Sequence, residues 1–269
     1  MIETAKKAAL AAGQIVMEHF RKLPPGAIRS KQKNDFLSFV DEQSEQTIIT
    51  IIKESFPKHA FLAEESGASR NENDYLWIID PLDGTTNYIT GLPIFAISIA
   101  LLYRGAPLLG IVYDPLHKEL FWAKKGKGAF LNEQPIHVSN KNRLEESLIA
   151  TGFPFKAKHF LKPYLQAFED IFLSSVGMRR MGAAAIDLAY VAAGRFEGFW
   201  EIGLSPWDIA AGGLLVSEAG GRISDFWDND SFLYKNYTVA SNGHIHKALI
   251  EKLKRYFPHY QRVYQAKGD

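Results

Sequence analysis

A short hydrophobic segment that ends in an aspartate constrains this chain more than any other feature. Trp77, Ile78 and Ile79 are apolar and bulky, which is typical of a buried strand. Asp80 follows at once, and Pro81 has no backbone N–H to donate to a neighbouring strand, so we expect the strand to end at Asp80. A carboxylate is thereby delivered to the end of a core strand, where burial without a cation is costly.

The residues after this strand predict a turn. Asp83 and Gly84 favour a reversal of the chain, and Thr85 or Thr86 can cap the helix that would follow. Asp80 and Asp83 thus form a pair of carboxylates close together in the sequence. Capping and turn formation would explain the pair, and so would cation binding. The rest of the chain has to decide between them.

Composition restricts the class of protein. The chain has 269 residues, of which 46% are hydrophobic and 23% charged, as in globular proteins with a sizeable core. A net charge of +1 gives no general electrostatic reason to bind nucleic acid or a membrane. Cysteine is absent, which excludes disulfides, thiolate metal sites and cysteine nucleophiles. No apolar run approaches the roughly 18 residues that span a bilayer. The N-terminal residues lack a signal-peptide pattern, so we expect a cytoplasmic protein.

Hydrophobic periodicity predicts two helices and then a series of strands in the first half of the chain. The helices are expected at residues 3–22 and 41–55, separated by a polar segment, 28–39, that is either a mobile loop or a loose hairpin. Strands are expected at residues 60–63, 94–103, 108–113, 119–124, 128–131 and 136–138. This order is typical of an α+β unit.

Strands and helices alternate in the second half. The expected strands are residues 147–151, 177–180, 196–201, 223 and 237–240, and the expected helices are residues 162–173, 183–193, 207–219 and 245–256. This predicts a sheet with helices on its faces, so the fold class is α+β or α/β. We place a boundary between residues 1–146 and residues 147–269, and expect the two halves to pack tightly enough to count as one domain.

Carboxylates follow apolar segments at two other places. Glu64 and Glu65 follow a short strand, and Asp208 lies where a helix is expected to begin. Taken alone, the glutamates would be a solvated pair and Asp208 a helix cap. Together with Asp80 and Asp83, they offer the hard oxygen ligands that Mg²⁺ prefers. Four histidines have no zinc spacing and are expected at the surface, namely His117, His137, His159 and His244.

These residues also carry a resemblance to a known family. Asp-Pro-Leu-Asp-Gly-Thr-Thr-Asn at 80–87, Glu-Glu-Ser at 64–66 and Trp-Asp-Ile-Ala-Ala-Gly at 207–212 resemble the inositol monophosphatase family, and the resemblance covers nearly the whole chain. Ala-Gly-Gly at 219–221 fits the same pattern, and the run at 179–191 is similar to the prokaryotic branch. The resemblance implies a layered αβαβα sandwich of the inositol monophosphatase and fructose-1,6-bisphosphatase type. It also implies two or three Mg²⁺ ions per subunit, sensitivity to lithium, and a homodimer.

Carried over position by position, the resemblance implies roles for the matched residues. The metal ligands would be Glu64, Asp80, the Leu82 carbonyl, Asp83 and Asp208. The catalytic residues would be Glu64 and Thr85, which would orient the attacking water, and Asp41, which would polarise Thr85. The substrate would contact Asp83, Gly84, Thr85, Gly182, Ala183, Glu201 and Asp208. Residues 31–35 match the family's mobile metal loop poorly, which leaves the third metal open.

The reaction implied by the resemblance is Mg²⁺-dependent hydrolysis of a phosphate monoester. A phosphorylated polyol, inositol 1-phosphate, is the favoured substrate, and Glu201 suits a polyol because a carboxylate accepts hydrogen bonds from neighbouring hydroxyls. The same machinery would serve fructose 1,6-bisphosphate, adenosine 3′,5′-bisphosphate or NADP.

A non-catalytic role is the other alternative, because some bacterial relatives act with the transcription machinery. Arg179 and Arg180 could face such a partner. A solvated or dimer-rim pair explains these arginines more simply at a net charge of +1, so RNA polymerase and nucleic acid are not the expected partners.

Overall fold

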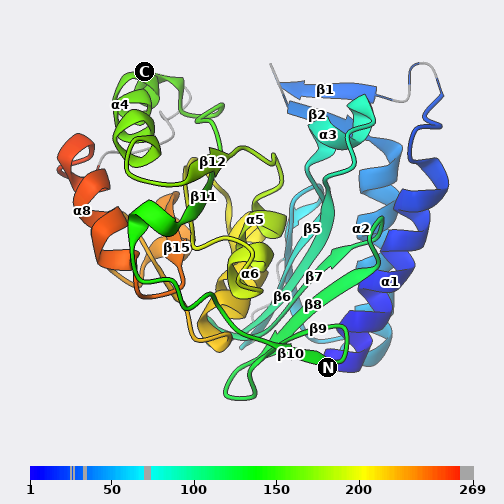
Figure 1. Cartoon of the computed structure of the whole chain (residues 1–269). Coiled ribbons are helices and arrows are strands. Elements are labelled where there is room, and N and C mark those ends of the chain that lie inside the picture. The colour runs from blue at the N-terminus through cyan, green and yellow to red at the C-terminus, as the bar shows by residue number, and fades with distance from the viewer. Residues whose placement is uncertain (25, 27, 33–34, 70–73, 261–269) are drawn as a thin grey trace.

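The computed structural model describes residues 1–24, 26, 28–32, 35–69 and 74–260 of the chain. Two large sheets, of eight and five strands, stack with helices between them and on both outer sides (Figure 1). From right to left in Figure 1, the layers are α1 with α2, the eight-stranded sheet, α5 with α6, the five-stranded sheet, and α4 with α8. The predicted αβαβα sandwich is confirmed. None of the described helices combines the length and hydrophobicity needed to cross a membrane.

The eight-stranded sheet is built almost entirely from antiparallel neighbours. Its order is β10-β9-β8-β7-β6-β5-β3-β4, and only the β3–β5 pair is parallel within it. The strands are β3 (Ala60–Ala63), β4 (Gly67–Ala68), β5 (Tyr75–Asp83), β6 (Ala96–Tyr103), β7 (Ala106–Asp114), β8 (Glu119–Lys124), β9 (Ala129–Leu131) and β10 (Gln134–Ile136). Its outer face is covered by α1 (Ile2–His19) and α2 (Phe39–Ser55), whose apolar faces pack on alternate residues of the strands.

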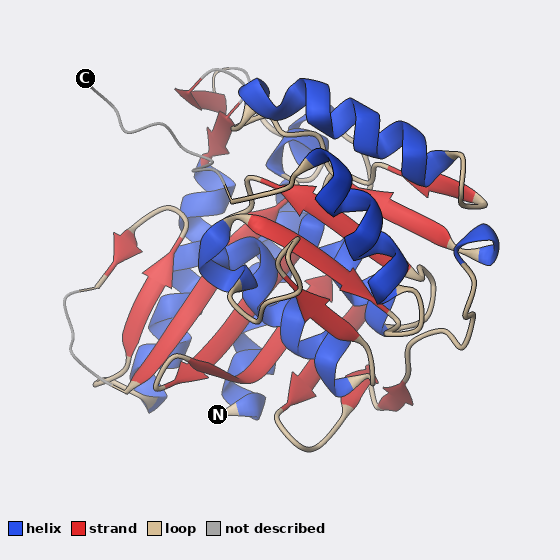
Figure 2. Ribbon diagram, turned by 90° about the vertical axis from the view of Figure 1, so that its left-hand side faces the viewer, coloured by secondary structure: helices blue, strands red, loops and turns tan. Residues whose placement is uncertain are grey.

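The five-stranded sheet has the order β12-β11-β13-β15-β14. β11 is parallel to β12 and β13, whereas β15 is antiparallel to both of its neighbours. The strands are β11 (Leu148–Thr151), β12 (Gly177–Arg179), β13 (Gly198–Ile202), β14 (Arg222–Ser224) and β15 (Tyr237–Ser241). Figure 2 views the molecule from the side that α4 (Leu161–Phe172) and α8 (His246–Tyr256) cover.

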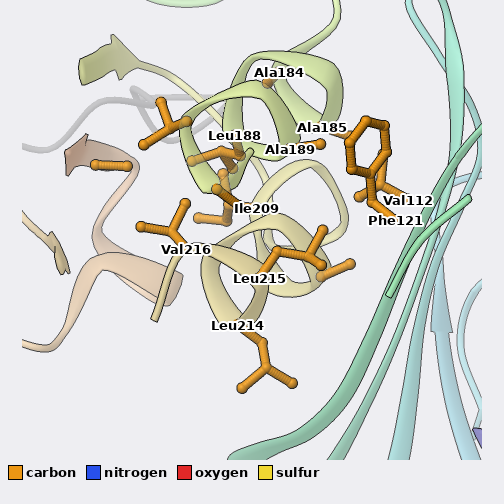
Figure 3. Packing of buried hydrophobic residues seen from close by; sticks show 14 of the residues in the cluster. Val112, Phe121, Ala184, Ala185, Leu188, Ala189, Ile209, Leu214, Leu215 and Val216 are labelled. Atoms are coloured by element: carbon orange, nitrogen blue, oxygen red, sulfur yellow. The ribbon is translucent and has the colours of Figure 1, made fainter. Parts of the chain in front are cut away.

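The middle layer consists of α5 (Ala184–Ala192) and α6 (Pro206–Glu218). Both helices lie between two sheets, so they are buried on nearly all sides rather than along one stripe. Small side chains such as Ala185 and Ala189 allow this close packing, and Val112 and Phe121 of the large sheet reach them from one side (Figure 3). The central core therefore holds the two sheets together. The remaining helical segments are α3 (Thr85–Thr90), α7 (Phe232–Lys235) and the 3₁₀ turns Leu144–Glu146 and Lys158–Phe160.

One sequence-based boundary is corrected at the N-terminal end, and one pair of alternatives is decided. The first helix ends at His19 rather than at residue 22, because Arg21 adopts a left-handed conformation (φ 60°) and donates hydrogen bonds to the Gly91 carbonyl. The polar segment forms a hairpin, β1 (Ile28–Gln32) with β2 (Asp35–Ser38), which was one of the two alternatives. The proposed boundary at residues 146 and 147 stays a prediction.

Candidate active site

The predicted end of the central strand at Asp80 is wrong, and the correction explains the geometry of the site. β5 continues to Asp83, but its pairing with β6 shifts: Asp80 faces Ser98 and Asp83 faces Ala96. One extra residue on β5 therefore forms a bulge, which is a position where Pro81 costs no ladder hydrogen bond. The bulge also changes the strict alternation of side chains, so two residues three apart reach the same face.

The turn after β5 forms without the predicted threonine cap. Gly84 is the residue before α3, its φ is +90°, and a Cβ there would lie 2.9 Å from the Ile94 carbonyl oxygen. Thr85 instead begins the helix, with no side-chain capping bond. Its hydroxyl lies 2.9 Å from the Leu82 carbonyl oxygen and 3.1 Å from Oδ1 of Asp41. Because both partners can only accept, the single hydroxyl proton points toward them and an oxygen lone pair remains for another donor.

Asp208 serves as a helix cap and also joins the acidic cluster. Its Oδ2 accepts a 2.7 Å hydrogen bond from the Ser205 backbone N–H at the start of α6, as the capping interpretation predicts. The Ser98 hydroxyl donates to the Trp207 carbonyl at 2.9 Å. Since Ser98 pairs with Asp80 across the sheet, this bond holds the start of α6 against the end of β5.

The three aspartates meet although they come from distant parts of the sequence. Each offers a carboxylate oxygen that lies within 4.8 Å of those of the other two. Burial, then Glu64, Asp83 and Asp208, raise the pKa of Asp80 well above its usual range. Burial and Asp208 do the same to the pKa of Asp83, although the Ala185 backbone N–H donates to its Oδ2 at 2.7 Å. Carboxylates thus dominate the charged groups that act on Asp80 and Asp83 in the described part of the chain, and each disfavours ionisation of the others.

A buried glutamate that the sequence analysis did not identify holds the turn that carries Glu64. Glu45 of α2 is 3% exposed and accepts hydrogen bonds from the backbone N–H groups of Glu65 and Ser66, at 2.8 and 2.9 Å. The Glu64 N–H donates to the Ile79 carbonyl at 3.1 Å, which ties the turn to β5. Glu64 and Glu65 are partly buried rather than a solvated pair. The signal for Glu45 was its place on the buried face of a helix, where an unpaired carboxylate is rare.

A cavity of about 600 Å³ opens over the aspartates. All predicted metal and substrate residues line it: Glu64, Asp80, Leu82, Asp83, Gly84, Thr85, Gly182, Ala183, Glu201 and Asp208. Asp41 is not among its lining residues and reaches it through Thr85. Burial raises the pKa of Glu201 to about 8, against the opposing effect of Arg180. The structure thus brings the predicted residues together, and their individual roles stay predictions.

The cavity has a basic and aromatic side that the sequence analysis missed. Phe153, Phe155, Lys156 and Arg180 line it. Arg180 is exposed and lines this cavity, and the neighbouring Arg179 is exposed outside the cavity lining, so the interpretation of the two arginines as a solvated or dimer-rim pair stays a prediction. No local pattern marked these residues, because loops from separate strand ends bring them together only in the folded chain.

The residues present fit a divalent cation of the Mg²⁺ type. The carboxylates are hard oxygen donors, and the nearby Leu82 carbonyl adds a neutral one. Asp80 and Asp83 are held by backbone N–H groups, which fixes their orientation. Carboxylates that raise one another's pKa are stabilised when a cation balances them, so the donor set is suited to metal binding.

Comparison with known proteins identifies the class of protein to which this fold and site belong. The model of the inositol monophosphatase family matches residues 1–257, so the chain belongs to that family. The resemblance inferred from the motifs is confirmed.

Individual relatives are similar over nearly their whole length. The chain is 44% identical to Nus factor SuhB of Pseudomonas aeruginosa over 263 residues, which cover 96% of this chain and 97% of the relative. Extragenic suppressor protein suhB from Bartonella henselae is 40% identical, with a TM-score of 0.91 over 94% of this chain and 98% of that one. Inositol monophosphatase from Anabaena is also 40% identical, with a TM-score of 0.85 over 94% of each chain.

Proposed function

We propose that this chain is a Mg²⁺-dependent phosphatase that hydrolyses phosphate monoesters, with inositol 1-phosphate as a substrate. The observation that carries the proposal is the cluster of three aspartate oxygens within 4.8 Å of one another in a cavity of about 600 Å³. Membership of the inositol monophosphatase family supports the same reaction. The carboxylates would repel a phosphate unless cations lay between them, so substrate binding requires metal.

The metal would be held by Glu64, Asp80, the Leu82 carbonyl, Asp83 and Asp208, with two or three ions per subunit. When bound, Mg²⁺ supplies charge that neutralises the phosphate and lowers the pKa of a bound water. Glu64, Asp83 and Asp208 all raise the pKa of Asp80, so its carboxylate is close enough to each of them to suit a ligand shared by two ions.

The side chain of Thr85 would orient the attacking water. Its hydroxyl proton is directed to Asp41 or to the Leu82 carbonyl, so its oxygen accepts a hydrogen bond from the water. Asp41 is 1% exposed and fixes this direction from within the core. Glu64 would accept the proton that the water loses, and the backbone N–H groups of Gly84 and Thr85 would donate to the phosphate oxygens.

The leaving alcohol would contact Gly182, Ala183 and Glu201 of the cavity lining. Gly182 and Ala183 offer backbone groups there, and the Glu201 carboxyl offers hydrogen bonds to neighbouring hydroxyls. A cavity lined both by the aspartates and by Glu201 suits a phosphate ester with a hydroxyl-bearing alcohol.

Release of inorganic phosphate tests the proposal. The purified chain should release phosphate from inositol 1-phosphate in Mg²⁺, release none in EDTA, and recover when Mg²⁺ is restored. A panel with fructose 1,6-bisphosphate, adenosine 3′,5′-bisphosphate and NADP ranks the substrates. Turnover that persists after rigorous chelation, or the absence of turnover on every member of the panel, would contradict the proposal.

Further properties come with the family resemblance and are proposed on that basis. We propose that lithium inhibits the activity, which a dose series in constant Mg²⁺ tests. We also propose a homodimer, which light scattering during gel filtration tests, since a mass near the 30.2 kDa of one chain would contradict it.

A second candidate function is a part in transcription, which the name Nus factor of relatives at 44% identity favours. We propose Arg179 as a residue of that contact surface, because it is exposed outside the cavity lining. Arg179→Ala should weaken retention of RNA polymerase in a pull-down while turnover is unchanged. Equal retention by the variant would remove Arg179 from the surface, and no retention by the unmodified chain would contradict the candidate function.

A further inference from the structure

A buried glycine, Gly152, lies against the carboxyl group of Glu201 in the five-stranded sheet. β11 and β13 are parallel neighbours, and Thr151 at the end of β11 pairs with Trp200 of β13. The next residue along the first of these segments is Gly152, and the next along the second is Glu201. Glu201 lines the cavity, so the two segments meet at its wall.

The absence of a side chain at Gly152 gives the Glu201 carboxyl group its place. A Cβ at position 152 would collide with Cδ and both carboxyl oxygens of Glu201, which are the three nearest atoms that it would meet. The φ angle of Gly152 lies outside the left-handed region, so the backbone conformation there does not require glycine. What requires glycine at this position is the neighbouring carboxyl group.

The backbone at Gly152 is held against β13 by the residue before it. The Thr151 hydroxyl donates to the Trp200 carbonyl at 2.8 Å, and it lies 3.1 Å from the Tyr164 hydroxyl. Since the single proton of Thr151 goes to the carbonyl, the Tyr164 O–H donates to Thr151. Thr151 and Tyr164 are both fully buried. A side chain added at Gly152 would therefore displace the flexible end of Glu201 rather than the backbone.

The charges around Glu201 decide the direction in which its carboxyl group would move. Asp187 of α5 is 1% exposed, and its pKa is raised well above the usual value by burial and then by Glu201. Repulsion between the two carboxylates thus opposes a movement of Glu201 toward Asp187. Arg180 and Lys156 lower the pKa of Glu201, and both line the cavity. A displaced Glu201 carboxyl would therefore move into the cavity, where the alcohol of the substrate would lie.

We propose that Gly152 is a specificity-determining positioning residue. Its missing side chain holds the Glu201 carboxyl group back in the wall, where the hydroxyl groups of the leaving alcohol would meet it. The chain thereby favours phosphate monoesters of polyhydroxylated alcohols over esters of alcohols that carry no further hydroxyl. Gly152 is not among the residues that line the cavity, so it acts through Glu201 rather than by contact with substrate. This inference rests on the proposed phosphatase function.

A purely structural role for Gly152 leads to different results. If the glycine only allows the end of β11 to pack, its replacement distorts the cavity for every substrate and lowers stability whatever residue stands at position 201. If it positions Glu201, its replacement affects hydroxyl-bearing substrates selectively, and the effect disappears when the Glu201 carboxyl group is removed. Two substrates and a double-mutant cycle therefore separate the two roles.

The first part of the experiment measures kcat and KM in saturating Mg²⁺ for inositol 1-phosphate and for phenyl phosphate, whose alcohol has no further hydroxyl. Gly152→Ala should raise KM for inositol 1-phosphate about 10-fold or more, because hydrogen bonds to its hydroxyls are lost. KM for phenyl phosphate should stay within about 2-fold. The matched control is Gly177→Ala in the same sheet, where the nearest atom to an added Cβ is 3.7 Å away, and it should change neither value.

The second part adds Glu201→Ala and the double variant Gly152→Ala/Glu201→Ala. In the Glu201→Ala background, Gly152→Ala should change KM for inositol 1-phosphate by less than about 2-fold, since the group that it displaces is absent. Melting temperatures of the same four proteins give a readout that does not depend on activity. Gly152→Ala should lower the melting temperature less in the double variant than in the unmodified chain. If the single variant does not fold, the double variant should, because the collision is removed.

The remaining outcomes overturn the inference. An equal rise in KM for both substrates would assign Gly152 to general packing, and an unchanged KM for inositol 1-phosphate would show that Glu201 is not displaced. The same rise in the Glu201→Ala background, or a double variant that also fails to fold, would contradict the link between the two residues. Failure of the proposed function looks different, because the unmodified chain would then release phosphate from neither substrate while the melting temperatures still report the collision.

Discussion

Two aspartates, Asp225 and Asp80, are both buried but differ in their hydrogen-bond partners, in the charges around them and in the direction of their pKa shifts. Asp225 is 0% exposed, and its carboxylate is surrounded by donors. It accepts from the backbone N–H groups of Trp227 and Asn229, from the Asn229 amide, from the Ser231 hydroxyl, and from the Lys235 ammonium at 3.0 Å. Burial alone would raise its pKa, but these hydrogen bonds, with Asn229 foremost, lower it below the usual value. Asp225 is a charge that the protein has fully compensated.

Asp80 is 2% exposed and lacks such compensation. Within the described residues, one backbone N–H, that of Leu82, donates to it at 2.9 Å, and its nearest charged neighbours are carboxylates. The comparison teaches that burial of a carboxylate does not mark a functional site. An unbalanced buried charge does, because the fold tolerates it only where a ligand completes it.

The largest expected effect is a loss of stability when Asp225, the aspartate with compensating partners, is replaced. Asp225→Ala should lower the free energy of unfolding by about 3–5 kcal/mol, because Lys235 and several N–H groups lose their acceptor in a buried place. The loss should be the same in Mg²⁺ and in EDTA, as Asp225 lies outside the cavity. Urea unfolding under both conditions measures it. A loss below about 1 kcal/mol would show that the two aspartates do not differ as described.

Asp80→Asn should remove activity without lowering stability, the opposite of what is expected for Asp225→Ala. Turnover should fall by more than about 100-fold, because mutation of residues that only hydrogen-bond to a metal ligand already lowers activity by up to about 100-fold. In EDTA the free energy of unfolding should be unchanged or higher, because one of several repelling carboxylates is gone. The same urea unfolding and a phosphate-release assay test both parts. If the variant kept its turnover or were destabilised in EDTA, Asp80 would belong with Asp225 as a structural residue.

Thr85 lies beside the aspartate cluster but carries no charge, so its replacement tests the orientation of the attacking water separately from metal binding. Thr85→Ala should reduce kcat by about 10- to 100-fold while the Mg²⁺ concentration for half-maximal activity changes little. Thr85→Ser, which keeps the hydroxyl, is the matched control and should recover most of the activity. A large loss of Mg²⁺ affinity with normal kcat at saturation would assign Thr85 to metal binding instead.

The smallest effect is a difference in pH dependence. In metal-free protein, the raised pKa of Asp80 means that the folded state holds its proton at pH values where the unfolded state has lost it. Its contribution to stability is therefore present below the usual pKa of 3.8 and is lost as pH rises toward the folded value. Chemical unfolding of the unmodified chain and of Asp80→Asn, at a series of pH values above 4, should show the variant gaining relative stability as pH rises.

The contribution of Asp225 to stability should change with pH in the opposite direction. Its pKa is lowered from 3.8, so its contribution is present above that value and is lost as pH falls through the lower folded value. The stability gap between the unmodified chain and Asp225→Ala should thus narrow as pH falls below about 4. Gaps that change with pH in the same direction for both aspartates would contradict the comparison.

Local patterns predicted most of the helices, strands and acidic residues, and the family resemblance implied the layers. Hydrophobic periodicity located the helices and strands, and the motif around Asp80 and Asp83 identified the cluster with Asp208. The bulge in β5 was missed, since Pro81 fits a strand end and a bulge equally well and only the pairing with β6 distinguishes them. Four histidines expected at the surface are exposed: His117, His137, His159 and His244.

Features that depend on long-range contacts were beyond the sequence. Glu45 holds the turn at Glu65, and Arg180 contributes to the lining of the cavity. Neither residue has a local signal, because each meets its neighbours through the packing of separate elements. The compensation of Asp225 likewise needs Lys235 from a short helix that no periodicity revealed.

The most direct test of the metal site uses Asp208, the cluster member contributed by the second half of the chain. Melting temperatures of the unmodified chain and of Asp208→Asn are measured in EDTA and in Mg²⁺. Asparagine can still accept the Ser205 hydrogen bond, so the cap is retained and the two proteins should melt at similar temperatures in EDTA. Mg²⁺ should raise the melting temperature of the unmodified chain clearly more than that of the variant, because binding to the folded state stabilises it. An equal rise in both proteins would contradict the claim that the aspartate cluster holds the metal.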